Sequence, residues 1–218
     1  MTLTFPRQIL NDRLAECTID LDPGTEQAVH SRGRRATVSR VREPVWFGTF
    51  ETPQLMDGDR IAWQSWGKSL RGGLRTFLAW DASRDLPLAY MSDGQMPDDG
   101  GSPWDGVATV SSLATPGQID LTGVPAGYQA TAGDRIGLEQ EISSRDRYGY
   151  FEIMEDATAD GSGNLSVTVE PLVPSMFTTA AVAKLYRPLC EFRLVKDSFS
   201  APSRVGYPAV SFQGVQVL

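Results

Sequence analysis

The chain has 218 residues, of which 41% are hydrophobic and 22% are charged, and its formal net charge is −7. This composition is typical of a folded globular protein, and the length allows one large domain or two small ones. The negative charge argues against non-specific binding of duplex DNA, which depends on Lys and Arg neutralising phosphates, although it leaves room for a local basic patch.

The chain begins MTLTFPRQILNDRLAEC, in which no basic segment precedes an apolar core, so no signal peptide is expected. No apolar run reaches the roughly 18 residues that a transmembrane helix needs. The two cysteines, Cys17 and Cys190, make no disulfide framework and are expected to be reduced and partly buried. These features predict a protein that stays in a cytoplasm or is assembled there into something larger.

The first strand signals lie in ATVSRVREPVWFGTFETP, where apolar, β-branched and aromatic residues alternate with polar ones. We expect two strands here, separated near Pro44, because proline cannot donate a hydrogen bond to a central ladder. The segment from 30 to 42, HSRGRRATVSRVR, contains five arginines and no acid. The five are Arg32, Arg34, Arg35, Arg40 and Arg42, and they form either a solvated charged strand or a contact surface.

The one clear helix signal covers residues 57–71, with an aspartate at position 57 or 59 as the expected N-cap. Trp63 and Trp66 are spaced to share one face of this helix. Gly72 follows where a helix favours a left-handed residue, so the helix is expected to end there.

Strands then dominate to the C-terminus, in RTFLAWD, DRIGLEQEI, GYFEIMEDA, NLSVTVEPL, AAVAKLYRP, CEFRLVKD and AVSFQGVQVL. Short strands separated by Gly, Asp and Pro turns are typical of a sandwich or a barrel. We therefore predict an all-β protein, in which residues 1–116 and 176–218 form a split β-sandwich. Residues 117–175 are predicted to form an inserted, small, barrel-like β-domain.

A long loop between residues 83 and 106 is rich in Asp, Gly and Pro, and a loop of this length is uncommon in a compact domain. Its Trp104 is expected at a surface or contact, whereas the other four tryptophans are expected in the core. Four aspartates make it a candidate acidic surface: Asp93, Asp98, Asp99 and Asp105.

The residue set does not indicate catalysis, a cofactor or a metal. His30 is the single histidine, no GxSxG elbow surrounds a serine, and there is no phosphate-binding glycine loop. Two cysteines and one histidine, far apart, do not have zinc-site spacing. ADGSGN and the long acidic loop offer oxygen ligands, but neither has the spacing of a calcium-binding loop, so both are expected to be turns.

Several motifs follow one another in a fixed order: VWFG, then a helix ending in LRG, then FLAWD, AGDRI, ADGSG, LSVTVEP and FRL. In this order, over residues 38–218, the chain resembles the distal tail proteins of long-tailed bacteriophages and phage-like particles. The long acidic loop, and the absence of such motifs before residue 38, depart from that pattern.

The resemblance implies a structural protein of the virion, without enzymatic activity, at the tip of a phage tail. It implies a homo-oligomeric ring of six copies that joins the tail tube protein to the hub and receptor-binding proteins, while DNA passes through without specific binding. Within such a ring, we expect the acidic loop to face the tube lumen or an adjacent ring. The arginines of residues 32–42 are expected either to dock on an acidic surface of a neighbouring subunit or to form a solvated charged strand. Two other functions fit the composition. One is a carbohydrate-binding β-sandwich that uses Trp104 and the acidic loop, and the other is a cell-wall hydrolase with a carboxylate pair.

Overall fold

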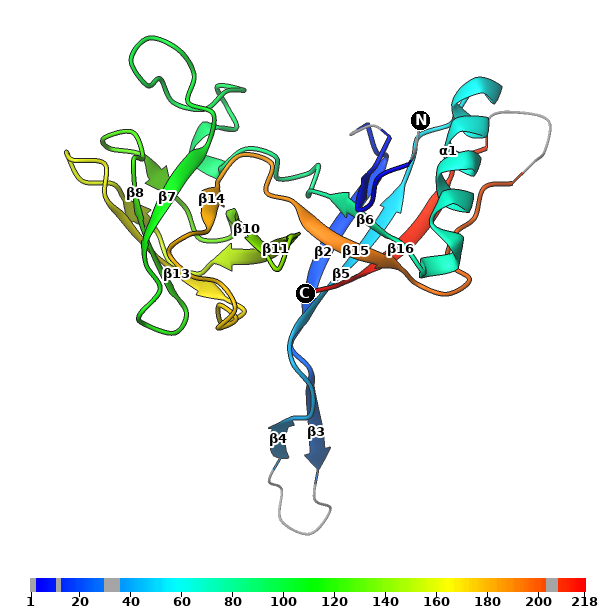
Figure 1. The fold of residues 1–218 in the computed structure, drawn as a ribbon, viewed down its shortest axis with the longest axis horizontal. Coiled ribbons are helices and arrows are strands. Elements are labelled where there is room, and N and C mark those ends of the chain that lie inside the picture. Colours follow the sequence, from blue (N-terminus) through cyan, green and yellow to red (C-terminus); the bar gives the residue numbers. More distant parts are fainter. Residues whose placement is uncertain (1–2, 11–12, 30–35, 203–207) are drawn as a thin grey trace. The chain divides into compact units, whose positions relative to one another are not determined.

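The computed structural model describes residues 3–10, 13–29, 36–202 and 208–218. The chain forms two compact units, both made mainly of β-strands (Figure 1). The sheet unit comprises residues 1–77 and 192–217, and the barrel unit comprises residues 78–191 together with Leu218. The all-β prediction is confirmed, with one α-helix and one small closed barrel.

A single open sheet of six strands forms the centre of the sheet unit, in the order β1-β6-β15-β16-β5-β2. Strands β2, β5, β16 and β15 pair antiparallel to one another. The bounds are β1 Arg7–Gln8, β2 Glu16–Asp22, β5 Val45–Glu51, β6 Thr76–Ala79, β15 Cys190–Leu194 and β16 Ser211–Gln216.

Helix α1 (Asp57–Ser69) packs on one face of this sheet through an aromatic core (Figure 1). The Trp66 ring is fully buried and meets the Phe77 and Phe212 rings edge-on or tilted, at centroid distances of 5.4 and 5.2 Å. Such pairs add about 0.5–1.5 kcal/mol each beyond the area that they bury. The predicted inward-facing tryptophans of this helix are therefore confirmed.

The two ends of α1 differ in how well the sequence predicted them. The helix begins at Asp57, so Met56 occupies the N-cap position and makes no side-chain capping bond. The predicted aspartate cap is wrong. Asp57 lies in the first turn, where its negative charge interacts favourably with the positive end of the helix dipole. The C-terminal prediction is confirmed, because Gly72 has a φ of 62° in the turn of 3₁₀-helix η1 (Arg71–Gly73).

The sheet unit differs in one respect from the predicted split β-sandwich. Within the described residues it contains one large sheet, with α1 in place of a second sheet. The sequence pattern of β5 does not distinguish a covering helix from a covering sheet. Trp46 and Phe50 are buried, whereas Phe47, between them, is 37% exposed. That pattern reveals one buried face, but a helix and a second sheet would bury it equally well.

Six antiparallel strands close into a barrel in the order β10-β11-β13-β8-β7-β14. Their inward side chains form one hydrophobic core, in which Ile119, Ile136 and Leu138 have no measurable exposure. The bounds are β7 Val107–Ser112, β8 Gln118–Thr122, β10 Arg135–Ile142, β11 Arg145–Ile153, β13 Leu165–Glu170 and β14 Val182–Lys184.

Three short elements complete the barrel unit: β9 (Gln129–Ala130), its partner β12 (Ala157–Thr158), and the 3₁₀-helix η2 (Leu88–Tyr90). The unit is inserted between β6 and β15, and it begins earlier and ends later than the predicted 117–175. The reason is that β7 and β14, which lie outside that range, pair with each other to close the barrel.

Two glycines of α1 provide a matched test of the aromatic core. A Cβ on Gly67 would lie 2.3 Å from the Phe199 ring, whereas a Cβ on Gly58 would meet nothing within 4 Å. We expect Gly67→Ala to lower the free energy of unfolding by about 1–3 kcal/mol through overpacking.

Gly58→Ala is expected to be neutral or to stabilise by up to about 1 kcal/mol, because alanine is the better helix former. Urea denaturation of both variants makes the comparison. Equal effects of the two substitutions would contradict the close packing of α1 against Phe199.

Candidate functional site

A hairpin projects from the sheet unit (Figure 1). Strands β3 (Thr25–Val29) and β4 (Ala36–Arg40) pair only with each other among the described residues. Val38 is 61% exposed and Val41 54% exposed. A two-stranded hairpin with both faces in water is marginally stable by itself, so this arm is suited to contact another surface.

The predicted arginine contact maps onto this arm. Arg40 ends β4 and is exposed, and Arg42 follows it and forms an ion pair with Asp22. The other predicted arginines, Arg32, Arg34 and Arg35, lie outside the described residues. Gly24 at the base has a φ of 65°, and a Cβ there would lie 2.3 Å from the Arg42 carbonyl oxygen. Glycine is therefore required where the arm leaves the sheet.

The sheet face opposite α1 forms a second candidate surface. Side chains alternate along each strand, so the residues between the buried aromatics point away from α1. Phe47 on this face is 37% exposed. Around it, the exposed side chains on β2, β5 and β16 are mostly acidic or polar: Glu16, Thr18, Asp20, Glu51 and Gln213.

The long acidic loop is ordered and anchored in the barrel unit. At its base Met96 is 3% exposed and Trp104 is 6% exposed. The Trp104 ring meets Tyr128 edge-on, with centroids 5.3 Å apart. The prediction that Trp104 lies at a surface or contact is therefore wrong, because this ring fills the barrel core and fixes the loop to it.

The four predicted aspartates of the loop are all exposed, so the loop presents an acidic surface as expected. Asp105 has a local role as well, since its Oδ1 accepts a hydrogen bond of 3.0 Å from the Val107 amide. Asp93 accepts one of 3.2 Å from the Ser92 hydroxyl. Asp98 and Asp99 lie at the tip, where two exposed glycines follow them.

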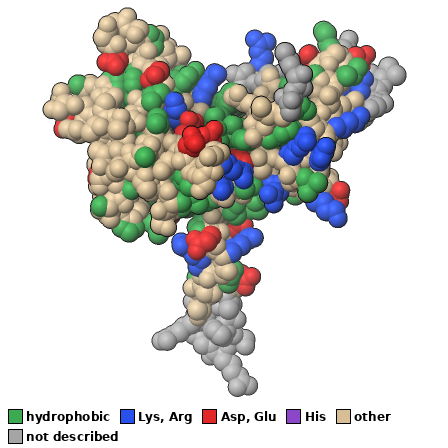
Figure 2. All heavy atoms as spheres, in the orientation of Figure 1, with side chains coloured by type: hydrophobic (Ala, Val, Ile, Leu, Met, Phe, Trp, Pro, Cys, Tyr) green, Lys and Arg blue, Asp and Glu red, His purple; other side chains and the backbone are tan. Residues whose placement is uncertain are grey.

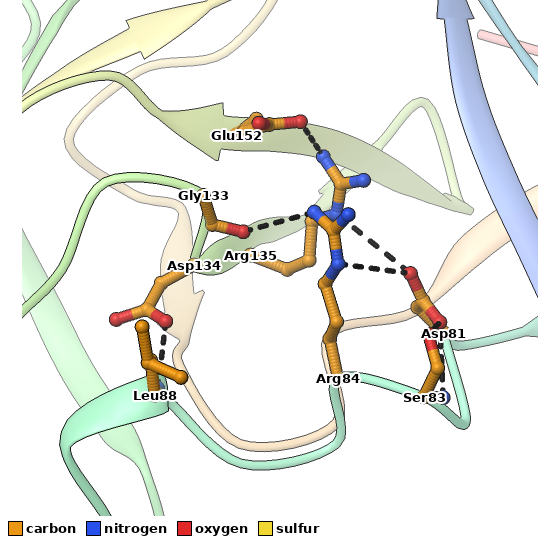
Figure 3. A network of polar contacts seen from close by, with 8 residues as sticks. All are labelled: Asp81, Ser83, Arg84, Leu88, Gly133, Asp134, Arg135 and Glu152. Carbon is orange, nitrogen blue, oxygen red and sulfur yellow. Dashed lines mark hydrogen bonds and ion pairs between the residues drawn. The ribbon is translucent and has the colours of Figure 1, made fainter.

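A buried polar network holds the start of this loop (Figure 3). Asp81 is 3% exposed and its Oδ2 lies 4.0 Å from the Arg135 Nε and 3.9 Å from the Arg84 Nε. The Ser83 amide donates to Asp81 Oδ1 at 3.0 Å, and Arg135 also pairs with Glu152. A charge this deeply buried requires such partners, because desolvation of an unpaired ion costs several kcal/mol.

Asp134 ties Leu88, which also lies near the start of the loop, to the barrel. One carboxylate oxygen of Asp134 accepts a hydrogen bond of 2.8 Å from the Leu88 amide (Figure 3). The other accepts one of 2.7 Å from the Thr131 amide. Burial raises the pKa of the Asp134 carboxyl, and the two amide donors oppose that rise. The sequence motif AGDRI thus supplies both Asp134, which caps a turn, and Arg135 of the buried network.

Two hollows on the barrel unit lie near polar side chains. One, of about 370 Å³, is lined by Arg84, Asp134, Glu152 and apolar residues of the acidic loop. These charged groups are already used in holding the loop. The other, of about 470 Å³, is lined by polar residues such as Asp120 and Asp160, and no aromatic residue is among its described lining. It lacks the flat ring on which sugars commonly stack.

Asp160 forms the turn that ADGSGN predicted. Its Oδ1 accepts from the amides of Ser162, at 2.8 Å, and Asn164, at 2.9 Å, and these bonds lower the pKa of its carboxyl. Among the described residues, no group of three His, Cys, Asp or Glu side chains is placed to hold a metal ion. No helix in the described ranges is long and apolar enough to cross a membrane.

Neither cysteine is in a disulfide; Cys17 is half-buried and Cys190 is buried. Burial raises the pKa of the Cys190 thiol well above its ordinary value, and the neighbouring Glu191 adds to this rise. A thiolate is the nucleophilic form of cysteine, so Cys190 is held in its unreactive state.

A scan against protein-family models finds no match to this chain. A search of curated proteins finds no significant match either.

The buried network gives a test of what holds the acidic loop. Replacing Arg135 by Met leaves Asp81 buried with only a half-exposed partner, and we expect a loss of about 3–5 kcal/mol in unfolding free energy. Arg84→Met removes a cation whose side chain is 45% exposed, and we expect a change of under about 1 kcal/mol.

Urea denaturation gives the size of each effect, and hydrogen–deuterium exchange locates it in the barrel unit. If the two variants lose similar small amounts, the Asp81–Arg135 pair does not hold the loop.

Proposed function

We propose that this chain is a structural protein of a bacteriophage tail. In this proposal six copies form a ring at the distal end of the tail, which joins the tube to the hub and receptor-binding proteins. The observation that carries it is the one-sided sheet with its projecting arm. Both present surface that the chain's own single helix leaves uncovered, as a subunit of a closed assembly requires.

The positions of the resembling motifs in the fold add support. In VWFG, a Cβ on Gly48 would lie 2.5 Å from the Phe50 ring. The LRG motif follows α1 directly, and its Gly72 takes a positive φ in η1. AGDRI and ADGSG supply Asp134 and Asp160, which cap turns of the barrel unit. The motifs shared in order with distal tail proteins are therefore those that this fold needs at fixed places.

The proposal assigns a role to each charged segment. Arginines of the arm, among them Arg40, offer planar guanidinium groups that suit carboxylates on a neighbouring subunit. The acidic loop, which carries Asp98 and Asp99, faces the lumen or an adjacent ring. Acidic residues near the DNA path would repel phosphate, so DNA would pass without binding. The protein would be assembled in the host cytoplasm, would remain in the virion, and would need no enzymatic activity or cofactor.

Ring formation is the direct test. We expect native mass spectrometry and electron microscopy of the purified protein, alone and with the tail tube protein, to reveal six-copy rings that bind the tube. A protein that stays monomeric under all conditions and binds neither tube nor hub would contradict the proposal.

A variant in which a short turn replaces residues 25–40 tests the role of the arm. It should lose ring formation but keep its melting temperature within a few degrees, because the described side chains of the arm are exposed. The rival functions predict other results. Glycan-array binding or a calcium-dependent melting shift would favour a carbohydrate-binding module, and clearing of a peptidoglycan suspension would favour a hydrolase.

A further inference from the structure

The two units carry opposite net charges. The barrel unit has 17 acidic and six basic residues, a net charge of −11, and residues 85–134 contain no Lys or Arg. The sheet unit has 14 basic and ten acidic residues, a net charge of +4. The formal charge of −7 for the whole chain therefore conceals a basic unit and a strongly acidic one.

Basic side chains converge at the C-terminal end of α1. Arg7 Nη1 donates to the Ser69 hydroxyl at 3.0 Å, and Arg75 Nη1 donates to the Ser69 carbonyl at 3.2 Å. Arg193 Cγ lies 3.4 Å from where a Cβ on Gly73 would stand. Lys68 and Arg71 flank Ser69 and are exposed. We call Arg7, Lys68, Arg71, Arg75 and Arg193 the basic patch.

The charges of the basic patch are available for a partner. The structure records no ion pair between any of its five residues and another described residue. In the space-filling view, basic side chains gather over the sheet unit at the right (Figure 2). Leu74 stands between Arg71 and Arg75 and is 80% exposed. Arginine is enriched at surfaces that bind protein, and Leu74 adds exposed apolar area next to Arg75 in the chain.

The matching acidic element is the tip of the barrel unit's loop, residues 97–104, which we call the acidic finger. It is a tight hairpin, in which Asp98 bridges Pro103, the Asp99 amide donates to the Ser102 carbonyl at 2.8 Å, and the Trp104 amide donates to the Pro97 carbonyl at 2.8 Å. Buried Trp104 anchors its base. Asp98 and Asp99 are thus presented on a held backbone, which reduces the entropy lost on binding.

We propose that the basic patch of one copy binds the acidic finger of a second copy. This inference rests on the proposed ring and supplies a contact for it. Because two different surfaces meet, the contact can repeat head-to-tail from copy to copy, and the proposed ring is the closed form of that repeat. Its opposite charges steer the copies together and make association sensitive to salt.

A second copy suits the patch better than nucleic acid does. Phosphates would pair with Arg71 and Arg75 but would leave the exposed Leu74 side chain without an apolar partner. An acidic complement lies in the chain's own barrel unit, and every copy brings one. Copies in a ring also hold patch and finger at high effective concentration, so that weak individual ion pairs suffice.

Charge reversal on each side tests the contact. We compare the full-length protein with Lys68→Glu/Arg71→Glu and with Asp98→Lys/Asp99→Lys by sedimentation at about 0.1 M and about 1 M salt. Each double variant should weaken self-association about tenfold or more, and high salt should weaken that of the unchanged protein. An equimolar mixture of the two variants should associate again, because each then offers the other an opposite charge.

Glu141→Lys/Asp146→Lys is the matched control for the finger reversal, since it makes the same charge change at two exposed residues that face each other beside the β10–β11 turn. It should associate like the unchanged protein. Assembly that is indifferent to both patch and finger reversals would overturn the inference and leave the proposed ring intact. A chain that is monomeric in all conditions would overturn both.

Two further results would also overturn the inference. One is a lower melting temperature of either charge-reversal variant with no change in the mass of its assembly, since the contact would then lie within one chain. The other is binding of duplex DNA that Lys68→Glu/Arg71→Glu abolishes, in a protein whose self-association that variant leaves unchanged.

Discussion

A sheet has two faces, and the described part of this chain has one α-helix to cover them. Trp63 and Trp66 bring α1 onto one face, where Phe77 and Phe212 meet it and Phe50 packs against both of these rings. Burial of these rings is the main stabilising term in the sheet unit. Once α1 is committed to that face, the acidic side chains of the other face remain in water, so the constraint that stabilises the unit also leaves a surface free for a partner.

The aromatic core is packed so closely that several positions beside it require glycine. The Phe192 ring and its neighbours fill the space where a Cβ would stand on Gly48 and on Gly214, and Phe199 does the same at Gly67. Rings of this size interdigitate only where facing positions are small. The order of glycines and aromatics along the chain is thus a packing requirement. It explains why the sequence resemblance rests on short motifs such as VWFG and not on catalytic residues.

Local patterns predicted most of the elements, whereas partners distant in sequence could not be predicted. Alternation located the strands, and the helix period located the Trp63–Trp66 face, because both depend on neighbours along the chain. Trp104 is buried against Tyr128, and Asp81 is paired with Arg135. Both partners are distant in sequence, and only the fold brings them near. An acidic, glycine-rich loop does not reveal that its tryptophan is an anchor. The separation of charge between the two units could be recognised only once the boundaries of the units were known.

Segregated charge has a physical consequence that a uniform surface would not have. If the net charge of −7 were spread evenly, copies would repel one another from every direction. In the proposed ring, the basic patch of one copy and the acidic finger of the next would attract each other, whereas pairing of identical patches would bring Arg71 against Arg71, which is unfavourable. Segregated charge of this kind disfavours like-to-like contacts and is compatible with the head-to-tail contacts that a ring requires.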